Sequence, residues 1–225
     1  MKKNVVHDLI VVFWRFLICS MCFYLTNIVF LGLLFTVHLT IVTAPLYLVA
    51  LIIAYPSIGA LGDLLRNRQW TTEVVEGAKL YWHYYWVNKW KYTKIGLLFT
   101  AIFLFLAADL YGANAIMKNG LFMPLVLVLT MIALVLLAWV IGIQSYFQID
   151  VKNSLKMAYY AASHYALNSV CLIALLFALY MAFSFIPQFV IFIAAPLFVQ
   201  GTMLITQRPL HEMRHQIKIT ELAHG

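Results

Sequence analysis

Residues 121–145, LFMPLVLVLTMIALVLLAWVIGIQS, form an apolar stretch that contains no charged side chain. A helix needs about 20 such residues to cross the hydrocarbon core of a bilayer. Further runs of similar character lie on both sides of this stretch, so we expect six membrane crossings. The predicted spans are residues 17–37, 41–62, 95–116, 121–145, 168–187 and 188–206. The sequence therefore predicts an all-α, polytopic helical bundle that forms a single membrane domain over residues 1–225.

The composition agrees with a membrane protein and excludes a water-soluble domain. Of the 225 residues, 64% are hydrophobic and only 10% are charged, which is far from the usage of soluble domains. The net charge of +7 is of the kind that nucleic-acid-binding proteins carry. However, the basic residues flank the predicted spans, where membrane insertion accounts for them. We therefore expect the lipid bilayer, and no nucleic acid, as a partner.

The basic residues also predict the topology. When the gaps between the six runs are assigned alternately to two sides, every one of the 15 Lys and Arg residues except Lys118 falls on the same side. Cytoplasmic segments carry the basic excess in membrane proteins. We therefore expect the N-terminus, the C-terminus and the tail, residues 207–225, to be cytoplasmic. The outer connections are short, and Lys118-Asn119-Gly120 is predicted to form one of them as a tight turn.

Two longer inner segments, residues 63–94 and 146–167, are predicted to be cytoplasmic interfacial helices. The first of them is rich in aromatic side chains close to lysines, a composition that favours the headgroup level of a membrane. Its aromatic residues are Tyr81, Trp82, Tyr84, Tyr85, Trp86, Trp90 and Tyr92. Prolines at positions 45 and 56 leave open a kinked or re-entrant second span.

The sequence His211-Glu212-Met213-Arg214-His215 matches the pattern H-E-x-x-H. On a helix the two histidines lie one turn apart and can hold Zn²⁺, while the glutamate polarises a bound water. Against this, Arg214 places a cation inside the motif, and a third ligand would have to be Glu221, His224 or a residue from another segment. We favour the alternative, an amphipathic tail helix that begins after Pro209.

Three polar side chains, Asn27, His38 and Asp109, lie within or beside the predicted spans. A carboxylate inside a span often marks a proton or ion pathway. Asp109, however, lies towards the outer end of its span, where it can reach the interface. Partial exposure, or a hydrogen bond to a hydroxyl on a neighbouring helix, explains Asp109 with fewer assumptions. Polar contacts between helices likewise explain Asn27 and His38. The small residues in Gly59-Ala60-Leu61-Gly62 similarly favour close helix packing over a site for a specific partner.

The stretches Thr26–Phe30 and Tyr55–Arg66 together resemble the YesL family of small bacterial membrane proteins. The basic turn at residues 66–70, Arg-Asn-Arg-Gln-Trp, and the aromatic run Tyr81–Lys94 extend the resemblance over roughly residues 10–100. The distance from Asn27 to the proline at position 56 is longer than the family pattern.

The resemblance implies a protein of the bacterial inner membrane that has no established catalytic activity and is associated with carbohydrate uptake. We therefore expect a non-enzymatic accessory or assembly subunit of a sugar ABC transporter, without a cofactor. Under this reading the partner surface is shaped by Pro56, Gly59, Gly62 and Arg66. The alternatives are a membrane-bound zinc hydrolase that uses His211, Glu212 and His215, and a stand-alone solute carrier that works through Asp109.

Overall fold

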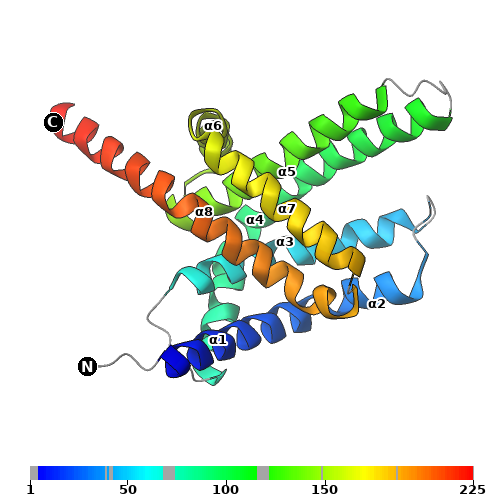
Figure 1. Ribbon diagram of the computed structural model, residues 1–225, viewed down its shortest axis with the longest axis horizontal. Coiled ribbons are helices and arrows are strands. Elements are labelled where there is room, and N and C mark those ends of the chain that lie inside the picture. The colour runs from blue at the N-terminus through cyan, green and yellow to red at the C-terminus, as the bar shows by residue number, and fades with distance from the viewer. Residues whose placement is uncertain are drawn as a thin grey trace. The chain divides into compact units, whose positions relative to one another are not determined.

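The structure is a computed structural model that describes residues 5–38, 40, 43–67, 74–115, 122–147, 149–185 and 187–224. Every regular element in these ranges is an α-helix, as the apolar runs predict (Figure 1). The helices are α1 Val5–Thr26, α2 Ile28–Thr36, α3 Ala44–Arg66, α4 Val74–Ala115, α5 Phe122–Phe147, α6 Val151–His164, α7 Ala166–Phe185 and α8 Pro187–His224. The predicted turn at Lys118-Asn119-Gly120 lies outside the described residues.

Several of these helices are long and apolar enough to cross a membrane. Among the described residues, four single helices qualify, and α1 with α2 makes a fifth if the bent pair is one span. The four are α3 from Pro45, α4 over Val75–Gly112, α5 and α7. The chain is therefore an α-helical, multi-pass membrane protein.

The first predicted span, residues 17–37, differs from the structure in two ways. The helix begins much earlier, at Val5, and it is bent by 68° between α1 and α2. The bend falls at Asn27, whose side-chain Nδ2 donates a hydrogen bond to the Phe23 carbonyl at 2.8 Å. Asparagine side chains compete with the backbone in this way and interrupt helices. The second predicted span, by contrast, is one helix that continues through Pro56 to Arg66.

The predicted boundary between the interfacial segment 63–94 and the span 95–116 is not a break in the structure. Residues 63–66 end α3, and α4 then runs without interruption for 42 residues from Val74. The run of lysines ends at Lys94, but a change in hydropathy does not end a helix unless a proline or a capping residue accompanies it. In the second inner segment, α6 occupies Val151–His164, inside the predicted range 146–167.

The tail after Pro209 is helical as predicted, but the predicted start of the helix is wrong, because α8 is continuous from Pro187 to His224. Proline lacks the N–H that would bond to the carbonyl four residues earlier, which here belongs to Ile205. Asn168 of α7 compensates, since its Nδ2 donates a hydrogen bond to the Ile205 carbonyl at 2.8 Å. The missing helix bond is thus replaced by one from a neighbouring helix, a common solution in membrane proteins.

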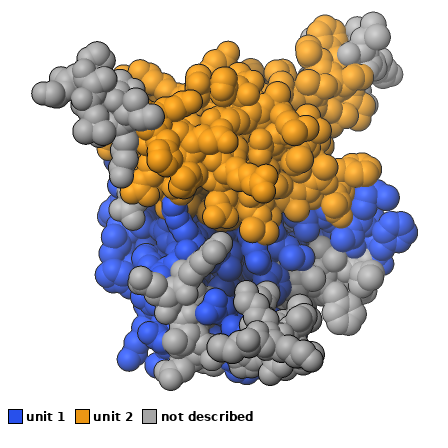
Figure 2. Space-filling view, turned by 60° about the vertical axis from the view of Figure 1, so that its left-hand side comes forward, with its two compact units in different colours: residues 1–96, 179–200 blue, residues 97–178, 201–225 orange. Residues whose placement is uncertain are grey.

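The chain divides into two compact units, coloured in Figure 2. Unit 1 comprises residues 1–96 and 179–200, and unit 2 comprises residues 97–178 and 201–225. In unit 1, α3 packs against α1 and α2, and its buried side chains include Ala60, Leu61 and Leu64. In unit 2, α5 packs against α6, and Trp139 of α5 is fully buried.

Candidate functional sites

In unit 1, α3 and α4 meet along a line of side chains that we call the α3–α4 seam. In the pairs that contact each other, the residue number rises by four along α3 while it falls by four along α4. The two helices are therefore antiparallel. Four residues make about one helical turn, which places each set on one face of its helix. The pairs in contact are Tyr55–Gly96, Gly59–Tyr92, Asp63–Asn88 and Asn67–Tyr84.

Two glycines allow the helices of the seam to approach closely. A Cβ atom placed on Gly59 would overlap the Tyr92 ring, and one placed on Gly96 would overlap the Tyr55 ring. Each helix therefore contributes one tyrosine and one glycine, four residues apart. The two sets are reciprocal, so each ring lies on the bare backbone of the other helix. Close approach at small residues is a general way in which membrane helices associate.

At the polar end of the seam, the buried carboxylate of Asp63 has hydrogen-bond partners. Asn88 Nδ2 donates a hydrogen bond to Asp63 Oδ2 at 2.8 Å, and Asp63 is only 8% exposed. The Tyr92 side chain and the Arg66 guanidinium also interact with this carboxylate. One turn further along, Asn67 Nδ2 donates to the Tyr84 hydroxyl at 2.9 Å. Hydrogen bonds and a nearby cation offset the cost of burying a carboxyl group in an apolar setting.

A second polar cluster lies at the bend between α1 and α2. Besides its bond to Phe23, Asn27 Nδ2 donates to Ser57 Oγ at 2.7 Å, and Ser57 Oγ donates to the Ala54 carbonyl at 2.7 Å. The buried Tyr81 side chain lies beside Ser57. Within the described part of the chain, Asn27 Oδ1 and the Tyr81 hydroxyl have no hydrogen-bond partner. The bend is therefore a buried polar point that joins α1, α3 and α4.

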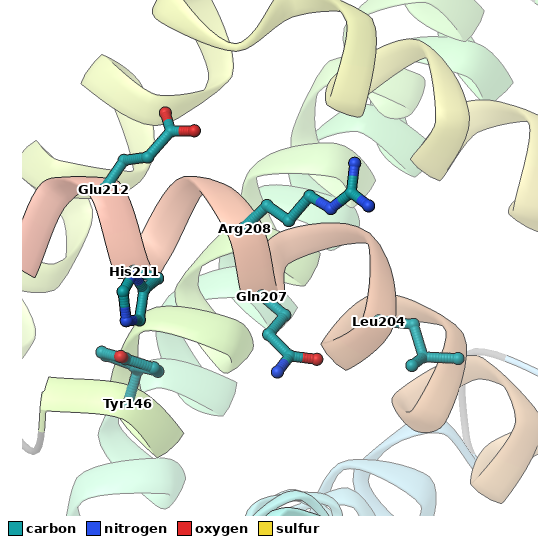
Figure 3. A pocket seen from close by; sticks show the side chains of 6 residues that line it. All are labelled: Tyr146, Leu204, Gln207, Arg208, His211 and Glu212. Carbon is teal, nitrogen blue, oxygen red and sulfur yellow. The ribbon is translucent and has the colours of Figure 1, made fainter.

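Unit 2 carries an open pocket with a volume of about 530 Å³ between α8 and the end of α5 (Figure 3). Most of its wall comes from exposed polar residues of α8. The lining residues are Tyr146, Leu204, Gln207, Arg208, His211 and Glu212. The Arg214 guanidinium lies 5.7 Å from the centroid of the Tyr146 ring, which adds a second cation close to the pocket.

The predicted metal ligands do not converge in this pocket. His211 and His215 lie one turn apart, with ring centroids 5.1 Å from each other. His211 points towards Tyr146, whereas Glu212 points away from it on another side of α8 (Figure 3). Glu212 instead interacts with Tyr165, and burial followed by this carboxylate raises the pKa of Tyr165. Among the residues whose side chains the structure describes, no three metal-binding groups gather. The candidate third ligands Glu221 and His224 lie outside them.

The residues predicted to shape a partner surface are placed differently from the expectation. Pro56, Gly59 and Gly62 are buried in unit 1, and Arg66 is half-buried beside Asp63. A partner surface at these four residues stays a prediction, although three of them are buried within unit 1. Gly59, for example, makes room for the Tyr92 ring.

The three predicted intramembrane polar residues also have different surroundings. Asn27 is buried and bonded to Ser57, which is the interhelical polar contact that the sequence predicts. His38 is exposed after the end of α2, where its carbonyl accepts a hydrogen bond from Thr43 Oγ1 at 2.7 Å. Asp109 is exposed on α4, in the part of that helix that belongs to unit 2. The structure does not bring these three residues together.

The sequence interpretation missed most of the seam, although a signal for it is present. Residues 55–59 read Y-P-S-I-G and residues 92–96 read Y-T-K-I-G, so the pattern Y-x-x-I-G occurs on both helices. A tyrosine and a glycine four residues apart share one helix face. The recurrence of this pattern would have predicted the two facing surfaces.

These features define the class of the protein as a multi-pass α-helical membrane protein whose helices are joined by close glycine contacts and buried polar pairs. Comparison of the chain with protein-family models, with curated proteins and with solved structures finds no match.

Proposed function

We propose that this chain is a protein of the bacterial inner membrane that crosses the bilayer six times, with both termini in the cytoplasm. The excess of Lys and Arg in alternate connections supports this orientation. Residues 188–206 of α8 would supply the sixth crossing, and α1 with α2 would supply the first. Labelling of single cysteines by an impermeant reagent tests the topology. We expect a cysteine at position 119 to react from outside the cell and one at position 225 to react only after lysis.

We further propose that the protein acts as a non-enzymatic accessory or assembly subunit of a carbohydrate ABC transporter. The resemblance of residues 26–30 and 55–66 to the YesL family supports this function. In the structure, residues from both stretches serve helix packing, since Asn27 bonds Ser57 and Gly59 receives the Tyr92 ring. Residues that hold the helices of the protein together fit a protein whose role in an assembly is structural.

The observation that carries the proposal is the exposure of α7. Leu172 is the one residue of this helix that is buried among those described, although the helix is apolar enough to span a membrane. Leu167, Val170 and Phe177 are 78%, 59% and 58% exposed. Membrane helices associate laterally through such faces. The transporter permease would therefore dock on α7, which replaces the glycine-rich segment as the proposed partner surface.

Affinity purification of the tagged full-length chain in mild detergent tests the partnership. From cells grown on an inducing sugar, we expect transporter subunits to co-purify and to be identified by mass spectrometry. The triple variant L167A/V170A/F177A should lose them, because it removes the apolar side chains of α7. The matched control L125A/L129A/I132A removes exposed side chains of α5, which are 55%, 44% and 51% exposed, and should retain them.

The possible outcomes test the accessory role and the docking of the transporter on α7 separately. Recovery of no transporter subunit on any sugar would contradict the accessory role. Equal recovery from both triple variants would leave the role standing but would exclude α7 as the contact.

A further inference from the structure

The exposed side of α4 in unit 1 carries a stripe of tryptophans between two lysines, which we call the tryptophan face. It consists of Lys79, Trp82, Trp86, Trp90 and Lys94, all of them exposed. Successive members lie three or four residues apart, so they share one side of the helix. The three tryptophans are 42%, 59% and 69% exposed, whereas the seam on the opposite side of α4 is buried.

Contacts between aromatic rings and with Lys89 hold the side chains of this face in place. Ring centroids lie 6.0 Å apart for Tyr81–Trp82, 5.7 Å for Trp82–Tyr85 and 5.8 Å for Tyr85–Trp86. Lys89 Nζ lies 4.2 Å from the centroid of the Trp86 ring and 5.6 Å from that of Trp90. An ammonium group over an aromatic face is attracted to it. The tryptophans are thus held in place with a positive charge against them.

The α3–α4 seam sets the depth of this face in the membrane. We place the outer edge of the hydrocarbon core at Ala44, where α3 begins. Because about 20 residues cross the core, its inner edge then falls at the level of Asp63. Because Asp63 pairs with Asn88, that level falls between Trp86 and Trp90. Each of these two lies roughly 3 Å from it, and Trp82 lies roughly 9 Å on the water side. Bilayer headgroup layers are several ångströms thick, so the stripe straddles the edge.

We propose that the tryptophan face binds the headgroup region of anionic lipids. Tryptophan rings favour this level because they are apolar with one polar N–H. The charges on the helix are complementary to an anionic surface, since residues 74–96 contain four lysines and a single carboxylate, Glu76. Lys94, on the hydrocarbon side of the edge, reaches the headgroups with its flexible chain. This inference goes beyond the proposed function and does not depend on a transporter partner.

Tryptophan fluorescence of the full-length protein in lipid vesicles tests the position of the face. The vesicles contain phosphatidylcholine alone or an equal mixture with phosphatidylglycerol, brominated either near the headgroup or deep in the acyl chain. We expect shallow bromine to quench more than deep bromine. The variant W82F/W86F/W90F should lose about half of the shallow quenching, because it removes three of the six tryptophans. Size-exclusion chromatography checks that the variant is folded.

A second measurement tests the charge. The preference of the tryptophans for brominated phosphatidylglycerol over phosphatidylcholine should fall about fivefold for each lysine removed in K79Q and K89Q. Lys156 of α6 is also exposed, and K156Q is the matched control that should leave this preference unchanged. Strong quenching of the three tryptophans by aqueous iodide in these vesicles would overturn the proposal and indicate a protein partner instead. An unchanged lipid preference in K79Q and K89Q would overturn it as well.

Discussion

The α3–α4 seam of unit 1 and the contacts of α8 in unit 2 join helices by different means. In the seam, two tyrosine rings lie on two glycines, and shape decides the register. In unit 2, Gly142 and Gly201 also admit close contacts, with Thr206 and Leu175. Hydrogen bonds between helices are added to them, as Asn168 Nδ2 donates to the Ile205 carbonyl and Trp139 Nε1 donates to Ser169 Oγ at 3.1 Å. Both means suit a membrane protein, because neither relies on the expulsion of water. They differ in how substitutions should act, and this difference can be tested.

The largest effect is expected from a side chain added within the seam. G59L and G96L should each destabilise the protein by about 3 kcal/mol or more, since a well-packed contact cannot accept the added volume. Thermal unfolding and monodispersity in detergent measure this loss. Gly32 of α2 provides the matched control, because nothing lies within 4 Å of the position that its Cβ would take. If G59L unfolded at the wild-type temperature, the close contact between Gly59 and Tyr92 would be refuted.

The next effect concerns the buried carboxylate of the seam. D63A should cost about 2 kcal/mol, because it leaves the Asn88 amide buried without its acceptor. D63N keeps an oxygen that can accept the same bond, so it should lose less stability than D63A. Thermal unfolding of the two variants side by side provides the measurement. Equal stability of D63A and wild type would show that the pair contributes nothing to unit 1.

In unit 2 the test concerns the hydrogen bond from Asn168 to the Ile205 carbonyl, which has no helix partner because Pro209 lacks an N–H. N168A should cost about 1–2 kcal/mol, because the Ile205 carbonyl then has neither its helix partner nor its side-chain partner. In a P209A background the backbone N–H returns, so the same substitution should cost less than half as much. A double-mutant cycle of unfolding free energies measures this coupling. Additive effects of the two substitutions would exclude the compensation.

The smallest effect is expected at the exposed histidines of α8. H211A and H215A should each change stability by less than about 0.5 kcal/mol, as substitutions on an exposed surface usually do. Metal analysis of the purified protein should find no difference between wild type and the variants. Loss of a stoichiometric zinc ion in either variant would restore the zinc hydrolase hypothesis, which the divergence of His211 and Glu212 in Figure 3 argues against.

Much of the helix content could be predicted from the sequence. The runs 41–62, 121–145 and 168–187 match α3, α5 and α7 closely, because each has few charges and ends where polar residues begin. The predicted ends were wrong where the helix and the apolar run do not coincide. Residues 5–16 carry charges, yet they are helical, since a polar face does not prevent a helix that contains no proline. Residues 74–94 were predicted to be helical, but not to continue without a break into the span.

The candidate sites were harder to predict than the spans. Asn27 was expected to make a contact between helices, but its partner Ser57 lies 30 residues away, and no local pattern indicates that pairing. The glycines at 59 and 62 were expected to serve close packing or a partner. Only the position of the Tyr92 ring shows that packing inside unit 1 uses Gly59.

The sequence by itself determined that this chain is helical and resides in a membrane, because both properties follow from runs of apolar side chains and from the placement of lysine and arginine. The tertiary structure decided which faces of those helices meet. Side-chain spacing shows that Tyr55 and Gly59 share a face of α3, but the choice of Gly96 and Tyr92 as their neighbours depends on shape and hydrogen bonding between segments far apart in the chain. The same is true of α8, whose passage through Pro209 depends on an asparagine of another helix.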